Sequence, residues 1–203
     1  MLYLSQLTLS PRSRQVQAEM RDPYEMHRTL AKAFGEGEEA QVAARCLFRV
    51  EEDRQGILRL LVQSQQPPAW EYLTALPGYL LAAPQVKPFA PSLRKGQALA
   101  FRLRANPTVR RDGKRLGLYG EEERLAWLRR KGAENGFSVE RVTISSEHSS
   151  KCQAKSHKAV FSAVLFEGIL RINDPELLLV ALTNGIGAGK GFGFGLLSLA
   201  PVK

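Results

Sequence analysis

The chain has 203 residues, of which 44% are apolar, and its formal net charge at pH 7 is +9. This apolar content argues against a disordered chain, and the length fits one large domain or two of roughly 100 residues each. The two cysteines, Cys46 and Cys152, lie far apart without a CxxC motif, which argues against a disulfide framework and is typical of a reducing cytoplasm. The longest apolar run, residues 177–182, is too short to cross a bilayer, so we expect a cytoplasmic protein without membrane contact.

The charge is distributed unevenly along the chain. Residues 1–91 contain ten basic and ten acidic residues, whereas residues 92–203 contain 19 basic and ten acidic residues. A basic half beside a neutral half is typical of a protein that binds a polyanion mainly with one half. A basic surface that serves solubility alone would give the same count, so the charge does not decide between these two interpretations.

The first half has the pattern strand, helix, strand, strand, helix, strand. Residues 2–9 alternate between apolar and polar as a strand does. Residues 22–34 predict a helix, because Asp22 can cap it, Pro23 suits its first position and Glu25 can close a capping box. The remaining elements are expected as a hairpin, a short helix and an extended stretch, at residues 46–52 and 57–64, 69–74, and 79–88.

The second half repeats this order after a linker at residues 89–97, which contains proline, glycine and charge. Residues 174–185 predict a helix with Asp174 as its cap, Pro175 at its first position and Gly185 just after its end. The other patterns predict four strands and one amphipathic helix with Leu125 and Leu128 inward, at residues 98–106, 137–144, 158–172 and 192–200, and at 121–136.

Two β-α-β-β-α-β units in one chain predict an α+β protein built from two tandem ferredoxin-like (RRM-like) domains. We expect the first domain to span residues 1–91 and the second, basic domain to span residues 92–203. Each domain of this kind presents a four-stranded sheet, which can receive single-stranded RNA.

One side of the helix at residues 22–34 carries chemically useful side chains. At 100° per residue, Met26, Leu30, Ala33 and Phe34 fall on the core side, and the other side holds Tyr24, His27, Arg28, Ala31 and Lys32. Such a set suits RNA cleavage without a metal, in which a ribose 2′-hydroxyl attacks its own 3′ phosphate. Histidine can accept or donate the proton, Arg28 or Lys32 can stabilise the phosphorane, and Tyr24 can orient the phosphate or the hydroxyl. For Tyr24 and His27 alone, a surface histidine beside a capping tyrosine is the simpler interpretation.

Residues 184–196, NGIGAGKGFGFGL, hold six alternating glycines and one lysine. Neither a Walker A loop nor a GxGxxG dinucleotide motif can be threaded through this segment. A plain helix-to-strand connection needs one or two glycines, whereas a groove lined by backbone N–H groups uses many, because a phosphate chain can then approach closely. We therefore expect RNA contacts from Gly185, Gly187, Gly189, Lys190, Gly191, Gly193 and Gly195.

Other basic residues lie on the strand at residues 98–106 and in the polar segment 145–158. We expect RNA contacts there from Arg102 and Arg104, and from Lys151, Lys155, His157 and Lys158. A solvated loop is the alternative for 145–158. A zinc site from His148, Cys152 and His157 matches no standard spacing, and the sequence has no HExxH and no acidic cluster, so we expect neither a metal nor another cofactor.

Together, these motifs resemble the repeat-RNA processing endoribonucleases of type I-E CRISPR (Cascade) systems. The family signature is Gly-hydrophobic-Gly, five residues that include a lysine or arginine, and a second Gly-hydrophobic-Gly. Residues 185–187, 188–192 and 193–195 match it in full. The resemblance extends over nearly the whole chain, through LLSLAP after the glycines, FRLRANP at 101–107, LFEG at 165–168 and YEMHRTL at 24–30.

The resemblance implies an enzyme that binds the stem-loop of a CRISPR repeat and cuts the precursor once at the base of the stem. The cut needs no metal and leaves a 2′,3′-cyclic phosphate and a 5′-hydroxyl. The enzyme then stays on the guide RNA with other Cascade subunits, and the assembled complex engages target DNA.

The resemblance also implies site residues. It places the catalytic pair at His27 and Tyr24, with Lys32 one turn on in contact with RNA, and it implies a basic hairpin in the stem's major groove, for which 145–158 is the candidate. The alternative function is a non-catalytic subunit that only grips an RNA hairpin. A metal nuclease, whose cleavage EDTA would abolish, is a third.

Overall fold

The structure is a computed structural model, and it describes residues 1–35, 37–53, 55–146, 151–154 and 157–202. The side chains of residues 146–160 lie outside this description. Contacts within the chain define two compact units. The first consists of Met1–Ala90, Cys152–Lys158 and Gly191–Gly193, and the second of Pro91–Lys151, Ala159–Lys190 and Phe194–Lys203. The division into domains at residues 1–91 and 92–203 stays a prediction.

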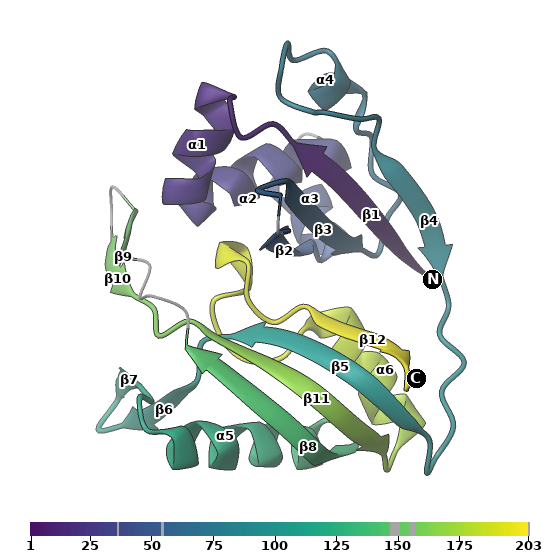
Figure 1. The fold of residues 1–203 in the computed structure, drawn as a ribbon, viewed down its shortest axis with the longest axis vertical. Coiled ribbons are helices and arrows are strands. Elements are labelled where there is room, and N and C mark those ends of the chain that lie inside the picture. The colour runs from purple at the N-terminus through teal and green to yellow at the C-terminus, as the bar shows by residue number, and fades with distance from the viewer. Residues whose placement is uncertain (36, 54, 147–150, 155–156, 203) are drawn as a thin grey trace. The chain divides into compact units, whose positions relative to one another are not determined.

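The first unit is a four-stranded antiparallel sheet in the order β2-β3-β1-β4, with its main helices on one face (Figure 1). Its strands are β1 (Leu2–Leu9), β2 (Leu47–Glu52), β3 (Leu58–Ser64) and β4 (Gln85–Phe89). Its helices are α1 (Arg14–Arg21), α2 (Pro23–Ala31), the 3₁₀ turn η1 (Lys32–Phe34), α3 (Glu38–Ala44) and α4 (Glu71–Thr74). Leu7 lies opposite Leu60 on neighbouring strands, and both are fully buried against Met26 and Leu30 of α2 in one apolar core.

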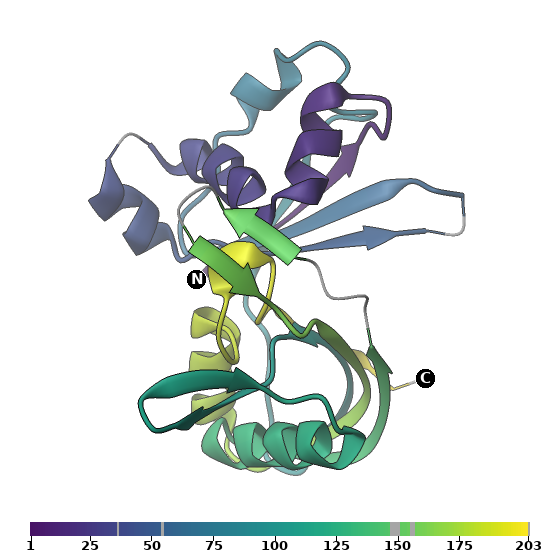
Figure 2. The ribbon, with the colours of Figure 1, turned by 90° about the vertical axis from the view of Figure 1, so that its left-hand side faces the viewer.

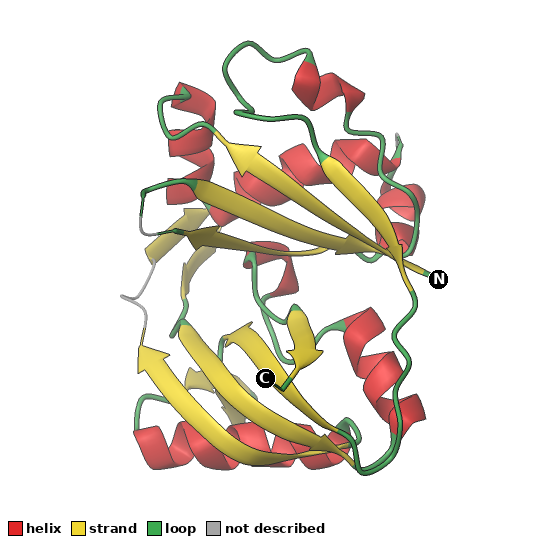
Figure 3. Ribbon diagram, turned by 45° about the vertical axis from the view of Figure 1, so that its right-hand side comes forward, coloured by secondary structure: helices red, strands yellow, loops and turns green. Residues whose placement is uncertain are grey.

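The second unit repeats this plan with the sheet order β12-β5-β11-β8 (Figure 3). Its strands are β5 (Ala98–Ala105), β8 (Phe137–Ser146), β11 (Val164–Ile172) and β12 (Leu197–Pro201), and its helices are α5 (Glu121–Glu134) and α6 (Pro175–Asn184). The 3₁₀ turn η2 (Lys190–Phe192) begins in this unit, and its last two residues belong to the first unit. The second unit also contains an antiparallel hairpin of β6 (Thr108–Arg111) with β7 (Lys114–Gly117). A further two-stranded ribbon pairs β9 (Lys151–Ala154) with β10 (His157–Val160), and most of its residues belong to the first unit. Figure 2 shows the β6–β7 hairpin beside α5.

Both sheets have the strand order 4-1-3-2 when their strands are numbered within each unit, which is the order of a ferredoxin-like fold. The predicted α+β architecture is therefore confirmed. Within the described ranges, no helix has the length and apolar character that a membrane span requires.

Several elements differ from the prediction, each for a local reason. Helices α1 and α3 were not predicted, because among their residues only Val16, Glu19 and Ala44 are buried and they show no apolar stripe. The stretch predicted as one strand over 158–172 is two, β10 and β11, and the chain between them turns inward with Phe161 buried. The strand predicted from residue 192 begins only at Leu197, because Gly193 and Gly195 have φ angles of 79° and 89°.

The predicted core side of α5 is confirmed only in part. Leu128 is fully buried, whereas Leu125 is only half-buried. Trp127, with an exposed fraction of 3%, is more deeply buried than Leu125. The Trp127 ring lies parallel to that of Phe166, with 6.0 Å between the ring centroids.

Candidate active site

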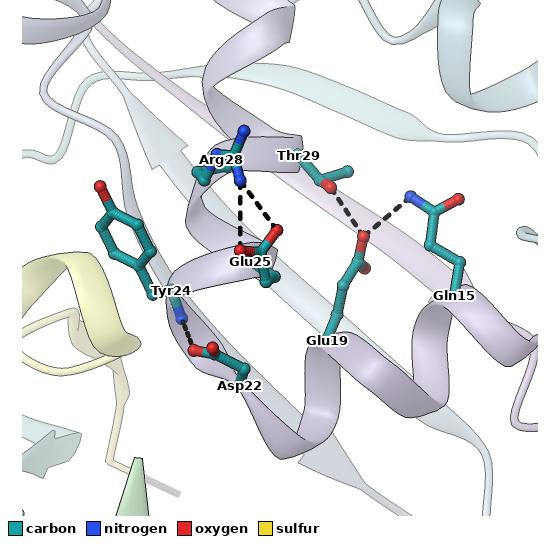
Figure 4. Close-up of polar contacts among 7 residues, drawn as sticks. All are labelled: Gln15, Glu19, Asp22, Tyr24, Glu25, Arg28 and Thr29. Carbon is teal, nitrogen blue, oxygen red and sulfur yellow. Dashed lines mark hydrogen bonds and ion pairs between the residues drawn. The ribbon is translucent and has the colours of Figure 1, made fainter. Parts of the chain in front are cut away.

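Helix α2 begins as its sequence predicts, apart from the capping box. The Asp22 carboxylate accepts a hydrogen bond of 3.0 Å from the backbone N–H of Tyr24, and Pro23 occupies the first helical position. Glu25 does not close a capping box, because the N–H of Asp22 already donates to the carbonyl of Ala18 in α1. The Glu25 carboxylate instead pairs with Arg28 at 3.2 Å (Figure 4).

A buried carboxylate ties α2 to α1. Glu19 is 3% exposed and accepts hydrogen bonds from the Thr29 hydroxyl at 2.6 Å, the Tyr79 hydroxyl at 2.6 Å and the Gln15 amide at 2.9 Å. Figure 4 shows the bonds from Thr29 and Gln15 converging on it. The Tyr72 hydroxyl also donates to the carbonyl of Thr29.

These bonds fix α2 from its buried side. Burial raises the pKa of both tyrosines, and the nearby Glu19 raises it further, so both phenols stay protonated as donors. Thr29 is two residues from His27, so the network holds the turn of helix that carries the histidine. No local sequence pattern predicts this network, since its members lie up to 60 residues apart.

His27 lies half-buried on the outer side of α2, among aromatic rings. The ring of Phe48 stacks on it with 6.4 Å between ring centroids and 17° between planes, and the Tyr24 ring lies 6.4 Å away. In the same unit, Phe192 lies 6.0 Å from Tyr24. A Cβ built on Gly191 would lie 3.8 Å from the His27 Nε2 atom, so the backbone there passes close to the imidazole.

Burial decides the protonation state of His27. Desolvation lowers its pKa from the ordinary value of 6.5, so the imidazole is neutral at pH 7. In the described part of the chain, its Nδ1 is the one buried side-chain nitrogen or oxygen atom without a hydrogen-bond partner. Nε2 is therefore the nitrogen left to exchange a proton with a bound molecule, and a neutral imidazole can act there as a base.

The other residues on α2 follow the predicted division into two sides, with one exception. Met26, Leu30, Ala33 and Phe34 are buried, as predicted, and Tyr24, Arg28 and Lys32 are exposed. Ala31 is only 5% exposed and belongs to the core, so its predicted place on the outer side is wrong. The outer side thus carries a phenol, an imidazole and two cations, one of which is paired with Glu25.

The two ends of the glycine-rich segment close a loop within the second unit, whereas its middle residues, Gly191–Gly193, belong to the first unit. The N–H of Ile186 donates to the carbonyl of Gly195 at 2.9 Å, and the N–H of Gly195 donates to the carbonyl of Arg104 at 2.8 Å, which ties the loop to β5. Five of the six alternating glycines have positive φ, at Gly185, Gly187, Gly189, Gly193 and Gly195.

The loop's own geometry requires glycine at two of these positions. A Cβ on Gly187 would lie 3.0 Å from the Trp127 ring, and a Cβ on Gly195 would lie 2.9 Å from the Ile186 carbonyl oxygen. Because the other three glycines with positive φ also lie in the conformation that favours glycine, the loop's conformation alone accounts for more than the one or two glycines expected of a plain connection. Contact between its backbone and RNA stays a prediction.

The predicted basic residues of β5 share one face, opposite to the buried Leu103. Arg102 pairs with Glu167 on the neighbouring strand at 2.6 Å, and the guanidinium of Arg104 lies 4.6 Å from the centre of the Phe194 ring. Part of the Arg102 charge is therefore neutralised.

The segment 145–158 can be placed only in part. Lys151, His157 and Lys158 lie on β9 and β10, where the side chains are outside the described part of the chain, and His148 and Lys155 lie outside it altogether. Among the described residues, no three histidine, cysteine, aspartate or glutamate side chains gather as metal ligands would.

The chain is similar to CRISPR-associated proteins over nearly its whole length. A family model described as "CRISPR associated protein" matches residues 2–201. The chain is 40% identical to the CRISPR-associated endoribonuclease Cse3 of Thermus thermophilus, over 98% of this chain and the whole of that protein. It is 33% identical to the CRISPR system Cascade subunit CasE of Escherichia coli, over 99% of this chain and the whole of that subunit.

Solved structures give the same result. A structure of Thermus thermophilus Cse3 bound to an RNA that represents a pre-cleavage complex superposes with a TM-score of 0.90 at 40% identity, over 98% of this chain and 99% of that chain. A chain of Escherichia coli Cascade bound to a double-stranded DNA target superposes with a TM-score of 0.57 at 29% identity, over 98% and 99%. The resemblance predicted from the sequence motifs is thereby confirmed, and the chain belongs to the Cse3/CasE family of CRISPR-associated proteins.

Proposed function

We propose that this protein is an endoribonuclease that binds the stem-loop of CRISPR repeat RNA and cleaves the precursor transcript without a metal ion. The single observation that carries the proposal is His27, a neutral and half-buried imidazole whose Nδ1 is buried and whose Nε2 remains for a substrate. The full-length similarity to Cse3, and the RNA bound to Cse3 in its solved structure, support the choice of RNA as the substrate.

The chemistry follows from the groups on the outer side of α2. Nε2 of His27 takes the proton of the ribose 2′-hydroxyl, and the 2′ oxygen attacks the adjacent phosphorus. The bond from phosphorus to the 5′ oxygen breaks, and the 5′ oxygen takes up the proton that the imidazolium now carries. The products are a 2′,3′-cyclic phosphate and a 5′-hydroxyl, and a positioned base of this kind accelerates such a step by roughly 10²–10⁴-fold.

The neighbouring residues have supporting roles in this scheme. The exposed Lys32 offers a cation to the charge that develops on the phosphorane, and Arg28 adds a second cation that Glu25 partly offsets. Tyr24, which is 44% exposed, orients the phosphate or the hydroxyl through its phenol. Asp22 and Pro23 fix the start of the helix and therefore the position of Tyr24.

The basic second half grips the RNA, in this proposal, through the glycine loop and Lys190, the Arg102–Arg104 face and the 145–158 segment. The enzyme then stays on the guide RNA as a cytoplasmic Cascade subunit, and the assembled complex engages target DNA. Support comes from CasE, a Cascade subunit, and from the similar chain in Cascade bound to its double-stranded DNA target.

The test is cleavage of a repeat hairpin in EDTA, with analysis of both new ends from the earliest time points. We expect one cut, a 2′,3′-cyclic phosphate and a 5′-hydroxyl. A requirement for magnesium, or a linear 3′ phosphate from the start of the reaction, would contradict the mechanism. Tight binding without any product at any pH would favour the alternative, a non-catalytic RNA-hairpin-binding subunit.

A further inference from the structure

The His27 imidazole lacks the hydrogen bond that usually orients a histidine base. An acceptor at the second ring nitrogen normally fixes both the tautomer and the orientation of such a ring. Among the described residues, no hydrogen-bond partner reaches the buried Nδ1 atom of His27. The orientation of the ring, and with it the direction of Nε2, must therefore be set by packing.

Phe48 supplies that packing from the neighbouring strand β2. Its ring is 2% exposed and lies nearly parallel to the imidazole, with 17° between the planes and 6.4 Å between the centroids. The Phe48 ring is itself fixed in place, because it lies opposite the buried Val62 in the strand register and belongs to the apolar core with Met26 of α2. Rotation of the imidazole about its bond to Cβ would break the parallel arrangement of the two rings, which is one that aromatic pairs in proteins favour.

The other neighbours of the imidazole are less able to hold it. Tyr24 is 44% exposed, and its ring is tilted by 39° from the imidazole, so the core does not fix this tyrosine. At Gly191 the neighbour is backbone without a side chain. Of the described aromatic rings beside His27, Phe48 is therefore the one that belongs to the core.

Phe48 also removes water from one side of the imidazole, which disfavours the charged form of the ring. The lowered pKa of His27 agrees with this, since desolvation is its cause. Arg49 and Glu51 of β2 pair with each other on the opposite face of the strand from Phe48, and Gly191–Gly193 contribute no titratable side chain. On α1, α2 and η1, the titratable groups nearest in the chain are Tyr24, the Glu25–Arg28 pair, Lys32, and Glu19, which is bonded to Thr29 and Tyr79.

We propose that Phe48 is a positioning residue for RNA cleavage: its ring holds the His27 imidazole so that Nε2 faces the substrate, in place of a hydrogen-bond acceptor at Nδ1. The proposal rests on the proposed function, since it requires His27 to be the base. Phe48 itself touches no substrate atom in this scheme and acts only through the histidine.

The test removes the ring and keeps its site apolar. Phe48→Leu and Phe48→Met both lack the aromatic face, and the flexible methionine fills the space if leucine leaves a cavity that prevents folding. The matched control is Phe34→Leu, the same substitution in the same core. The Phe34 ring packs edge-on against Trp70 rather than against His27, with 6.1 Å between the centroids and 75° between the planes. Urea unfolding identifies the variants that are folded.

Two readouts separate positioning from a loss of stability. The first is the pKa of His27 in the free protein, followed by NMR, with His27→Ala to assign its signal among the three histidines. The second is single-turnover cleavage at the pH plateau, with RNA affinity measured in parallel. We expect both Phe48 variants to raise the pKa of His27 toward 6.5. Cleavage should slow by roughly 2–10-fold, the rate equivalent of one aromatic pair, at unchanged affinity. Phe34→Leu should match the wild type in both readouts.

Three results would overturn the proposal: wild-type pKa and rate in both Phe48 variants, the same changes in Phe34→Leu, or a loss of affinity that equals the loss of rate. A lower pKa of His27 in the Phe48 variants would also contradict it, because the ring would then have stabilised the imidazolium through a cation–π contact. Failure of the proposed function would be distinct, since His27→Ala would then cut the hairpin at the wild-type rate.

Discussion

Helices α2 and α6 begin with the same Asp-Pro pair, although α2 lies between the first two strands of its sheet in chain order and α6 between the last two. Asp22 accepts a hydrogen bond from Tyr24 N–H, and Asp174 accepts one from Glu176 N–H at 2.9 Å and one from Leu177 N–H at 3.1 Å. Counted from the proline, the buried positions also coincide, with Met26 and Leu30 in α2 matched by Leu178 and Leu182 in α6.

The two helices differ on the remaining positions. The fourth residue after the proline is His27 in α2 and Leu179 in α6, the next is Arg28 against Val180, and the sixth is Thr29 against Ala181. Leu179 is 44% exposed and Val180 is 54% exposed, so α6 presents an apolar outer side where α2 presents an imidazole and a guanidinium. The N-cap and the buried apolar positions determine how each helix packs in its unit. The outer positions determine which chemical groups the helix offers to a bound molecule.

Removal of the imidazole from α2 should have the largest effect on activity. His27→Ala should slow single-turnover cleavage of a repeat hairpin by roughly 10²–10⁴-fold, because the base is lost, while the dissociation constant for the RNA changes little. The control is Leu179→Ala, which also introduces an alanine at the fourth position after the proline, but in α6. It should leave the rate at the wild-type value. An equal loss of affinity and rate in His27→Ala would make the residue a binding contact.

The second prediction makes α2 resemble α6 on its buried side. Thr29→Ala should lower the free energy of unfolding by about 1–3 kcal/mol, because the buried Glu19 carboxylate loses the hydroxyl that donates to it. The control is Thr183→Ala, whose exposed hydroxyl donates only to the Leu179 carbonyl of its own helix and should change stability by less than about 0.5 kcal/mol. Urea unfolding measures the change in the free energy of unfolding for each variant. Equal changes in the two variants would contradict the role of the Glu19 network in fixing α2.

The third prediction concerns pH. Since burial lowers the pKa of His27, the acid limb of kcat/KM against pH should have its midpoint below 6.5, with a plateau through pH 7. The lowered pKa also sets how the stability of the folded protein depends on pH. The folded protein binds this proton less readily than the unfolded chain, so stability is unaffected above pH 6.5 and falls as the pH drops from 6.5 to the folded pKa. A midpoint above 6.5 would contradict a desolvated imidazole.

The smallest expected effect lies in the loop that follows α6. Lys190→Ala should weaken RNA binding and reduce the slope of log K against log salt by about one unit or less, since one phosphate contact is lost. The matching change beside α2 is Lys32→Ala, which we expect to reduce the cleavage rate more than the affinity. If the slope of log K against log salt were unchanged in Lys190→Ala, Lys190 would make no contact with an RNA phosphate. The glycines would then serve only the conformation of the loop.

The sequence predicts most of the fold because its signals are local. The Asp-Pro caps locate α2 and α6, and the alternation along residues 2–9 and 98–106 locates β1 and β5. The β6–β7 hairpin has a local signal as well, because Asp112-Gly113 is a typical hairpin turn and both residues have positive φ. It was not predicted because its strands alternate in neither polarity nor burial, and half of their residues are charged.

The sequence predicts the outer side of α2 and misses its surroundings. Helical periodicity places Tyr24 and His27 together, which the 6.4 Å between their rings bears out. No spacing rule connects His27 to Phe48, or Glu19 to Tyr79 sixty residues away, since those neighbours are set by tertiary packing. The lowered pKa of His27 depends on that packing and therefore could not be predicted from the sequence.

The most direct test replaces one oxygen in the substrate. A repeat hairpin with deoxyribose at the nucleotide just before the cut lacks the hydroxyl from which His27 takes its proton. We expect this RNA to bind with the affinity of the all-ribose hairpin and to remain uncut in a single-turnover reaction, whereas deoxyribose one nucleotide further away leaves cleavage intact. Cleavage of the first RNA at the normal rate and position would contradict attack by the 2′-hydroxyl, and with it the role proposed for α2.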